Sequence, residues 1–119
     1  MRQAGIIAAG GLYALKYNVD RLKIDHQRAK QLESVLIELS WVKEVVPVET
    51  NIVVAILNDA SKRDQIIQQL KSEGILIMAF GEGMLRMVTH LDNSDADIDH
   101  LVTALATLWQ RCAISHAVA

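Results

Sequence analysis

Cysteine and aromatic residues are scarce in this sequence. Cys112 is the single cysteine among 119 residues, so the chain cannot form an internal disulfide. We therefore expect a reducing, cytoplasmic location rather than a disulfide-stabilised secreted domain. Two tryptophans, two tyrosines and one phenylalanine are too few and too scattered to provide a base-stacking platform for single-stranded nucleic acid.

Strong charge of either sign is also missing. The formal net charge is −2, and no basic stripe stands out, which argues against nucleic acid as a partner. The apolar run from Ala4 to Leu15 is shorter than the roughly 20 residues that a membrane-spanning helix needs. Gly10 and Gly11 interrupt it, and no small-x-small cleavage site follows, so we expect neither a signal peptide nor a membrane segment.

Apolar residues, in contrast, are plentiful. They make up 51% of the chain, enough for the core of one domain of this length. Residues 3–17 predict a buried helix that is weakest at Gly10-Gly11. Asn18 is a candidate cap for a second helix over about 19–39, whose apolar positions recur at helical spacing: Leu22, Ala29, Leu32, Leu36 and Leu39.

The period changes after residue 40. Val42 to Val48 is rich in β-branched residues, and Pro47 indicates an edge strand or a bulge. Residues 51–57 form a continuous apolar run typical of a buried strand. Ser61 and Asp64 match a capping box for a helix over about 61–73, which Gly74 is placed to end.

A second unit of the same kind follows. Residues 75–80 predict a strand, residues 81–83 a glycine turn, and residues 84–90 the returning strand. Ser94 and Asp97 form a second capping-box pattern before a helix that extends to about residue 113. Its apolar stripe is Ile98, Leu101, Val102, Leu105, Leu108 and Trp109.

These elements predict an α+β fold. Two helices precede two β-β-α units, which should form a small, mainly antiparallel sheet with helices on one face. We expect residues 1–40 to be a helical lead-in segment and residues 41–119 to be a small α+β domain.

Arg86 is the residue most suggestive of binding. It lies in the apolar strand Met84–His90, where alternation places Met84, Arg86, Val88 and His90 on one face. A guanidinium is always charged and suits a carboxylate through two parallel hydrogen bonds. The pattern alone leaves two interpretations open, an exposed arginine on a solvent face and an anion-binding residue. His90 is a possible neighbour of such a site, although a polar residue at a strand end explains it slightly better.

Other reactive residues form no recognisable set. The four histidines, His26, His90, His100 and His116, lack metal-ligand spacing, and no second cysteine could assist them. Cys112 lies near the apolar stripe of the last helix, which favours a buried structural thiol over a nucleophile. The glycines at 81 and 83 lack the further glycine or lysine of a phosphate loop. We therefore expect no metal site and no complete catalytic set.

The motif Met84-Leu-Arg-Met-Val-Thr-His-Leu-Asp92, followed by Ser94 and an amphipathic helix, resembles the C-terminal end of the low-specificity L-threonine aldolases. Three further stretches resemble the same family in the same order. They are residues 1–15 (MRQAGIIAAGGLYAL), Asp25-His26 with Ala29 and Leu32, and Thr50-Asn-Ile-Val53. The resemblance covers essentially the whole chain, although Asn93 replaces a residue that is usually apolar in the family.

The resemblance implies part of a pyridoxal-phosphate-dependent lyase with the aspartate-aminotransferase type of fold. Family members cleave L-threonine and L-allo-threonine to glycine and acetaldehyde. The chain resembles their small C-terminal domain with the helix that joins it to a large cofactor-binding domain. Arg86 matches the arginine that holds the α-carboxylate of the amino-acid substrate. Arg2, with Gln3, matches a position near the cofactor phosphate and the subunit interface.

The family's cofactor lysine lies upstream of the matched motifs, as do the histidine that stacks on the cofactor ring and the aspartate that pairs with its nitrogen. We therefore expect this chain alone to be inactive and not to hold the cofactor, since the cofactor supplies the electron-sink chemistry. The chain would be a truncated product, the second half of a split gene or a piece of a longer protein. We expect it to self-associate or to bind a missing large domain. The alternative function is a non-catalytic assembly or amino-acid-binding module.

Overall fold

The computed structural model describes residues 2–117, with the side chains of residue 109 and residues 111–117 outside the description. The elements follow the order predicted from the sequence, with two helices before two β-β-α units. They are α1 (Ala4–Tyr17), α2 (Leu22–Ile37), β1 (Val42–Val45), β2 (Ile52–Leu57), a 3-10 turn (Ala60–Lys62), α3 (Arg63–Ser72), β3 (Met78–Phe80), β4 (Met84–Val88) and α4 (Asp95–Ala117).

The four strands form one sheet in the order β1-β2-β4-β3, and each neighbouring pair is antiparallel. β1 is an edge strand whose register shifts between Val42 and Glu44, and Pro47 follows its end. This agrees with the expectation that a proline there marks an edge or a bulge. The centre of the sheet is the β2–β4 pair, which places Val54 directly opposite Arg86.

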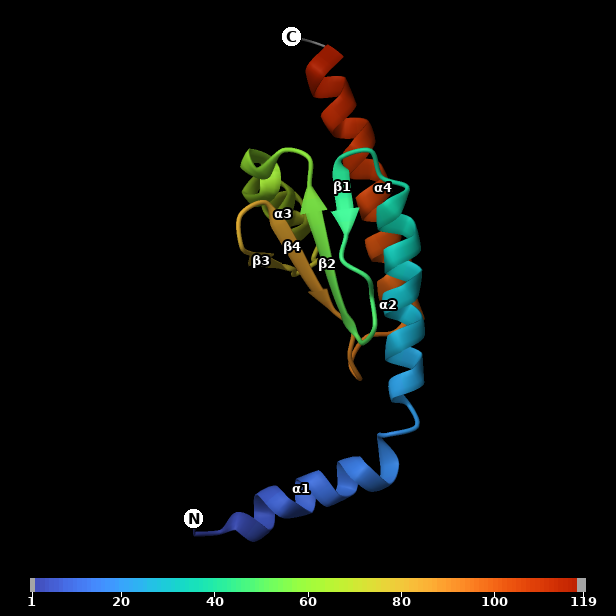
Figure 1. The fold of residues 1–119 in the computed structure, drawn as a ribbon, viewed down its shortest axis with the longest axis vertical. Helices are drawn as coiled ribbons and strands as arrows, with labels where there is room; N and C mark the ends of the chain where they lie inside the picture. The colour runs from blue at the N-terminus through green and yellow to red at the C-terminus, as the bar shows by residue number, and fades with distance from the viewer. Residues whose placement is uncertain (1, 118–119) are drawn as a thin grey trace.

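The hydrophobic core lies between one face of this sheet and the helices α2, α3 and α4 (Figure 1). The predicted α+β arrangement with helices on one face is therefore confirmed. Strands β1, β2 and β4 contribute residues from one face, and α2, α3 and α4 each contribute one stripe, whereas all of β3 is exposed. The most deeply buried members are Ala29, Leu32, Leu36, Val53, Ala55, Leu70, Leu85, Leu105 and Leu108.

Helix α1 stands apart from this core. It projects away from the body (Figure 1), which makes the molecule 61 × 28 × 25 Å in extent. No residue of α1 is buried, so the prediction of a buried helix is wrong for this chain. The helix is continuous through Gly10 and Gly11. Asn18 ends α1 by donating its main-chain N–H to the Ala14 carbonyl over 2.8 Å, and does not cap α2 as predicted.

α2 belongs to the core by its packing, because Ala29, Leu32 and Leu36 are buried on it. The division of the chain at residue 40 remains a prediction. Across residues 2–117, no helix combines the length and the apolarity required to cross a membrane.

The ends of α3 and α4 test the capping predictions. At α4 the reciprocal capping box is present, with Ser94 N–H donating to Asp97 Oδ2 over 2.7 Å and Asp97 N–H donating to Ser94 Oγ over 3.2 Å. At α3 the prediction is wrong, because Ser61 Oγ donates to Asp59 instead, over 2.6 Å, and Asp64 pairs with Arg63. The upstream aspartate offers Ser61 a closer acceptor and starts a 3-10 turn first.

Gly74 ends α3 as predicted. It has a φ of +81°, its N–H donates to the Lys71 carbonyl, and the Ile75 N–H donates to the Leu70 carbonyl. This is the Schellman arrangement that favours glycine. The strand predicted for residues 75–80 is shorter, since β3 begins only at Met78. Residues 75–77, which precede β3, lie outside the sheet, and the candidate site lies beside them.

Candidate functional site

Arg86 occupies the middle of β4, on the sheet face that no helix covers. The burial of β4 alternates, with Leu85 and Met87 buried and Met84, Arg86 and Val88 more accessible. The predicted alternation of side chains is therefore confirmed within β4. Directly opposite Arg86 lie Val54 on β2 and Met78 on β3. Residues opposite one another in an antiparallel pair share a face, so the guanidinium stem lies between two apolar side chains.

The surrounding face is largely apolar. Since pairing partners share a face, it carries the side chains of Ile52, Val54, Ile56, Met78, Phe80, Met84 and Val88 around Arg86; we term this set the outer sheet face. Among the side chains that the structure describes, none forms an ion pair or a hydrogen bond with the Arg86 guanidinium. A half-buried cation that has no counter-ion and apolar neighbours favours the binding of an anion.

A groove opens beside Arg86 where β3 begins. Met78 is the first β3 residue to pair with β4, and it lies opposite Arg86. The chain from Gly74 to Ile77 diverges from β4, leaving a groove of about 490 Å³ between this segment, residues 86–90 and the start of α4. Arg86 lines it, as do Leu76, Met78, Val88, His90 and Asp97. The volume lies within the range typical of small-molecule sites.

His90 lines the same groove, but its ring is part of a turn. The main-chain N–H of Asp92 donates to His90 Nδ1 over 3.2 Å, and the His90 N–H donates to Asn93 Oδ1 over 2.8 Å. These contacts give His90 a structural task at the end of the strand.

The α4 side of the groove is held by Arg28, a residue that no sequence motif marks. Its Nε donates to Asp95 Oδ1 over 3.0 Å, and its NH1 donates to the Asn93 carbonyl over 2.6 Å. The Arg28 side chain is only 14% exposed. Helical periodicity places it on a solvated face, and no local pattern could show that the loop after β4, some 65 residues later, folds back onto it.

Asp97 is the titrating group of the groove with a displaced pKa. Hydrogen bonds from the Ser94 main-chain N–H and then from the Ser94 hydroxyl lower the pKa of the Asp97 carboxyl, and the charges of His100 and Arg28 add to the effect. Asp97 therefore stays ionised, and its carboxylate accepts the hydrogen bonds from Ser94 that cap α4. Among the described residues, no group of three His, Cys, Asp or Glu side chains could hold a metal ion.

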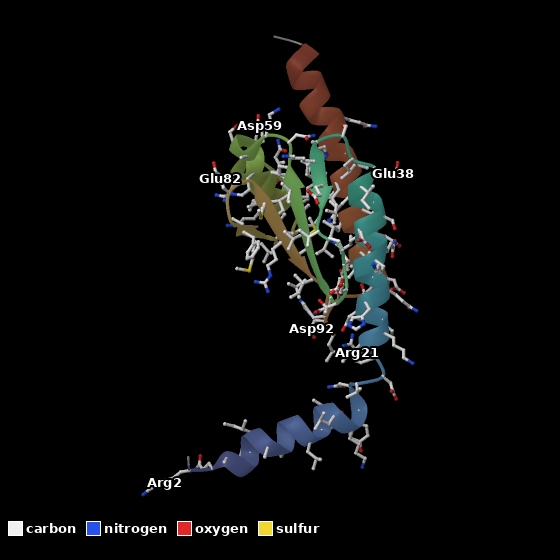
Figure 2. All side chains as sticks on the ribbon, in the orientation of Figure 1. Arg2, Arg21, Glu38, Asp59, Glu82 and Asp92 are labelled. Atoms are coloured by element: carbon white, nitrogen blue, oxygen red, sulfur yellow. The ribbon has the colours of Figure 1, made fainter. Side chains whose placement is uncertain are left out.

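Arg2 is not brought near Arg86. It is exposed at the start of α1, and Figure 2 shows it at the far tip of that helix, away from Asp92 at the end of the sheet body. The two basic residues indicated by the sequence thus lie in separate parts of the molecule. Cys112, whose buried position was predicted, and His116 have side chains outside the described residues.

The groove does not supply the groups that pyridoxal phosphate requires. The six lysines are Lys16, Lys23, Lys30, Lys43, Lys62 and Lys71, and none of them lines the groove. No amine is therefore available there to hold an aldehyde cofactor.

Asp25, a buried carboxylate on α2, is bound by both terminal nitrogens of Arg21 at 3.0 and 2.8 Å.

Known proteins resemble this chain in both sequence and fold. A family model described as beta-eliminating lyase matches residues 1–60. A low-specificity L-threonine aldolase of Escherichia coli O157:H7 is 37% identical over 94 residues, which cover 79% of this chain and 27% of that protein. Low-specificity L-threonine aldolase 1 of Arabidopsis thaliana is 29% identical over 106 residues, covering 87% of this chain and 30% of that protein.

A solved structure shares the fold. A Bacillus anthracis aminotransferase superposes with a TM-score of 0.63 at 19% sequence identity, over 76% of this chain and 23% of the other. The chain thus spans less than a third of the length of the curated relatives described above.

Proposed function

Because the chain belongs to the beta-eliminating lyase family and matches low-specificity L-threonine aldolases, we propose that it supplies the substrate-binding arginine of a threonine-aldolase-like lyase. In this proposal Arg86 holds the α-carboxylate of an amino-acid substrate. The observation that carries it is the unpaired Arg86 guanidinium within the described chain, set among apolar side chains at the edge of a groove. The rest of the enzyme provides the cofactor and the reacting groups.

The physical argument favours a carboxylate over other ligands. A planar guanidinium donates two parallel hydrogen bonds to the two oxygens of a carboxylate. Hydrogen bonds to charged groups contribute about 1.5–3 kcal/mol each when water is excluded. The apolar neighbours Val54 and Met78 hold the arginine stem, so little side-chain entropy is lost when the carboxylate binds. Arg86 binds and orients the substrate in this role and does not itself react.

The missing part of the enzyme has two surfaces to cover on this chain. One is the outer sheet face, on which Arg86 lies. The other is α1, where large apolar side chains are exposed all round the helix: Ile6, Ile7, Leu12, Tyr13, Leu15 and Tyr17. A helix that is apolar on every side is typically surrounded by protein. We infer that a large cofactor-binding domain or a second copy of the chain covers both surfaces.

Titration of the ¹⁵N-labelled chain with L-threonine tests the role of Arg86. The Arg86 side-chain Nε–H resonance should shift as the carboxylate binds, and Arg86→Gln should abolish saturable binding. Arg63→Gln is the matched control, because Arg63 is also near the sheet but is already bound to Asp64 and the Gly81 carbonyl. Equal binding by wild type and Arg86→Gln would refute the proposal.

A second measurement tests the division of labour. The isolated chain with pyridoxal phosphate and L-threonine should release no acetaldehyde. Sustained acetaldehyde release from the chain alone would contradict the proposal that the reacting groups lie elsewhere.

Exposed α1 also favours the second candidate function, an assembly module without catalysis. Sedimentation of the wild type should then show self-association that is weakened by replacing Ile7 and Leu12 with serine. A monomer at every accessible concentration would argue against assembly through α1.

A further inference from the structure

We propose that the groove beside Arg86 binds the side chain of the amino acid whose carboxylate Arg86 holds, and that it selects for an extended apolar side chain. This inference rests on the proposed function of Arg86, and it adds the substrate class. It follows from the position of residues 75–77, which lie outside the sheet just before β3 begins.

The groove continues from the Arg86 guanidinium toward the core. The pairing of β3 with β4 begins at Met78, opposite Arg86. The preceding residues 75–77 do not pair, and the opening between them and β4 reaches the core residues Leu32, Ile98 and Leu101. A ligand anchored by its carboxylate at Arg86 therefore has an apolar space directly beside it.

The entrance of the groove is unusually apolar for a surface. Leu76 is 80% exposed and Met78 is 62% exposed, and both line the groove together with Val88. Large apolar side chains on a water-exposed rim mark a ligand-binding surface more often than a scattered single residue does. An alkyl chain lying between Leu76, Met78 and Val88 would cover part of their exposed apolar surface.

The polar residues of the groove differ from Arg86 in that the described structure gives their side chains hydrogen-bond partners. Asp97 accepts hydrogen bonds from the Ser94 N–H and hydroxyl. Asn93 is bound by the His90 N–H and by Arg28, and His100 Nε2 lies 2.9 Å from the Glu73 carbonyl. The groove thus places the Arg86 cation next to the apolar side chains of Leu76, Met78 and Val88, which suits a carboxylate with an apolar tail, and the ionised Asp97 lies on its α4 side.

The size of the groove supports a long side chain. Its volume of about 490 Å³ falls within the range that holds small organic ligands. A bound carboxylate with a single methyl group would leave much of that space to water. An unbranched chain of three or four carbons would extend along the apolar wall.

Chemical-shift titrations with the full chain test the inference. The probes are L-alanine, L-2-aminobutyrate, L-norvaline and L-norleucine, which differ by one methylene at each step. Affinity should rise along the series, by up to about fourfold for each methylene that is fully buried. Leu76→Ser should flatten this increase, and the fold should be kept, because Leu76 is exposed and its loss does not disturb the core.

Leu91→Ser is the control, since Leu91 is an exposed leucine that does not line the groove; it should keep the wild-type increase. Met78→Ser should flatten the increase as Leu76→Ser does. Arg86-dependent binding with no increase along the series would overturn the groove inference and leave the proposed function intact. Absence of any Arg86-dependent binding would overturn both.

Discussion

The hydroxyl of Thr89, the residue that follows the Arg86 strand, donates a 2.8 Å hydrogen bond to the main-chain carbonyl of Asp25 on α2. Both residues are buried, although they are 64 positions apart in the chain. The Thr89 N–H also donates to the Asn51 carbonyl, and Asn51 Nδ2 donates back to the Thr89 carbonyl. The end of β4 is therefore fixed to α2 and to the start of β2, and these contacts hold the strand that carries Arg86.

Replacing Thr89 with valine should destabilise the fold by about 1 kcal/mol, because the shape is kept but the buried hydrogen bond is lost. The free energy of unfolding from urea titration measures this loss. Thr103→Val is the control, since the exposed Thr103 hydroxyl donates to the Asp99 carbonyl within α4 and its loss should cost less than about 0.5 kcal/mol. Equal losses of unfolding free energy in the two variants would show that the buried Thr89 hydrogen bond stabilises the fold no more than the exposed Thr103 hydrogen bond does.

The turn between β3 and β4 should tolerate alanine less well than the end of α3 does. Gly74 and Gly83 both have positive φ, +81° and +67°, so alanine costs about 1–2 kcal/mol at either site. A Cβ on Gly83 would also lie 2.8 Å from the Ala60 Cβ, whereas one on Gly74 meets nothing within 4 Å. Overpacking should add about 1–3 kcal/mol at Gly83 only.

Thermal unfolding of Gly83→Ala and Gly74→Ala measures the difference directly. Identical melting temperatures for the two variants would contradict the close approach of Gly83 to Ala60.

Acid should destabilise the protein partly through Asp97. Hydrogen bonds from Ser94 lower the Asp97 pKa in the folded state, so its stabilising contribution is complete above the ordinary carboxyl value of about 4 and is lost as pH falls through the lower folded value. Asp97→Asn should reduce the decline of unfolding free energy below about pH 4. Glu33 and Asp59, whose pKa values are also lowered, should maintain part of the decline. An unchanged pH profile in Asp97→Asn would show that the cap adds no acid sensitivity.

Helix α1 should contribute nothing to the stability of the sheet body. Leu12→Ala should change the free energy of unfolding by less than about 0.5 kcal/mol, because the Leu12 side chain is exposed. Leu32→Ala on α2 should cost about 2–5 kcal/mol, since it empties space in the core. Denaturation must be measured at a concentration where sedimentation shows a monomer. A large loss in Leu12→Ala under those conditions would place α1 against the body.

The sequence alone determined the order of elements, because strands and helices leave different apolar periods and most turns carry glycine or capping residues. The alternation along Met84–Val88 also places Arg86 on the face opposite Leu85 and Met87, since successive strand residues point to opposite sides. Whether the first helix is buried could not be determined in this way. Its composition predicts burial, but burial needs a partner surface, and the described chain provides none for it.

Only the tertiary structure decided what surrounds Arg86. Local pattern could not reveal that residues 75–77 leave the sheet, since their apolar side chains fit a strand equally well. It also could not show that Arg28 and Asp25 of α2 hold the loop and strand end beyond Arg86, because those hydrogen bonds join segments 65 and 64 residues apart. The sequence by itself thus determined that an arginine lies in an apolar strand. Long-range packing decided that this arginine has no partner among the described residues and stands at the edge of a groove.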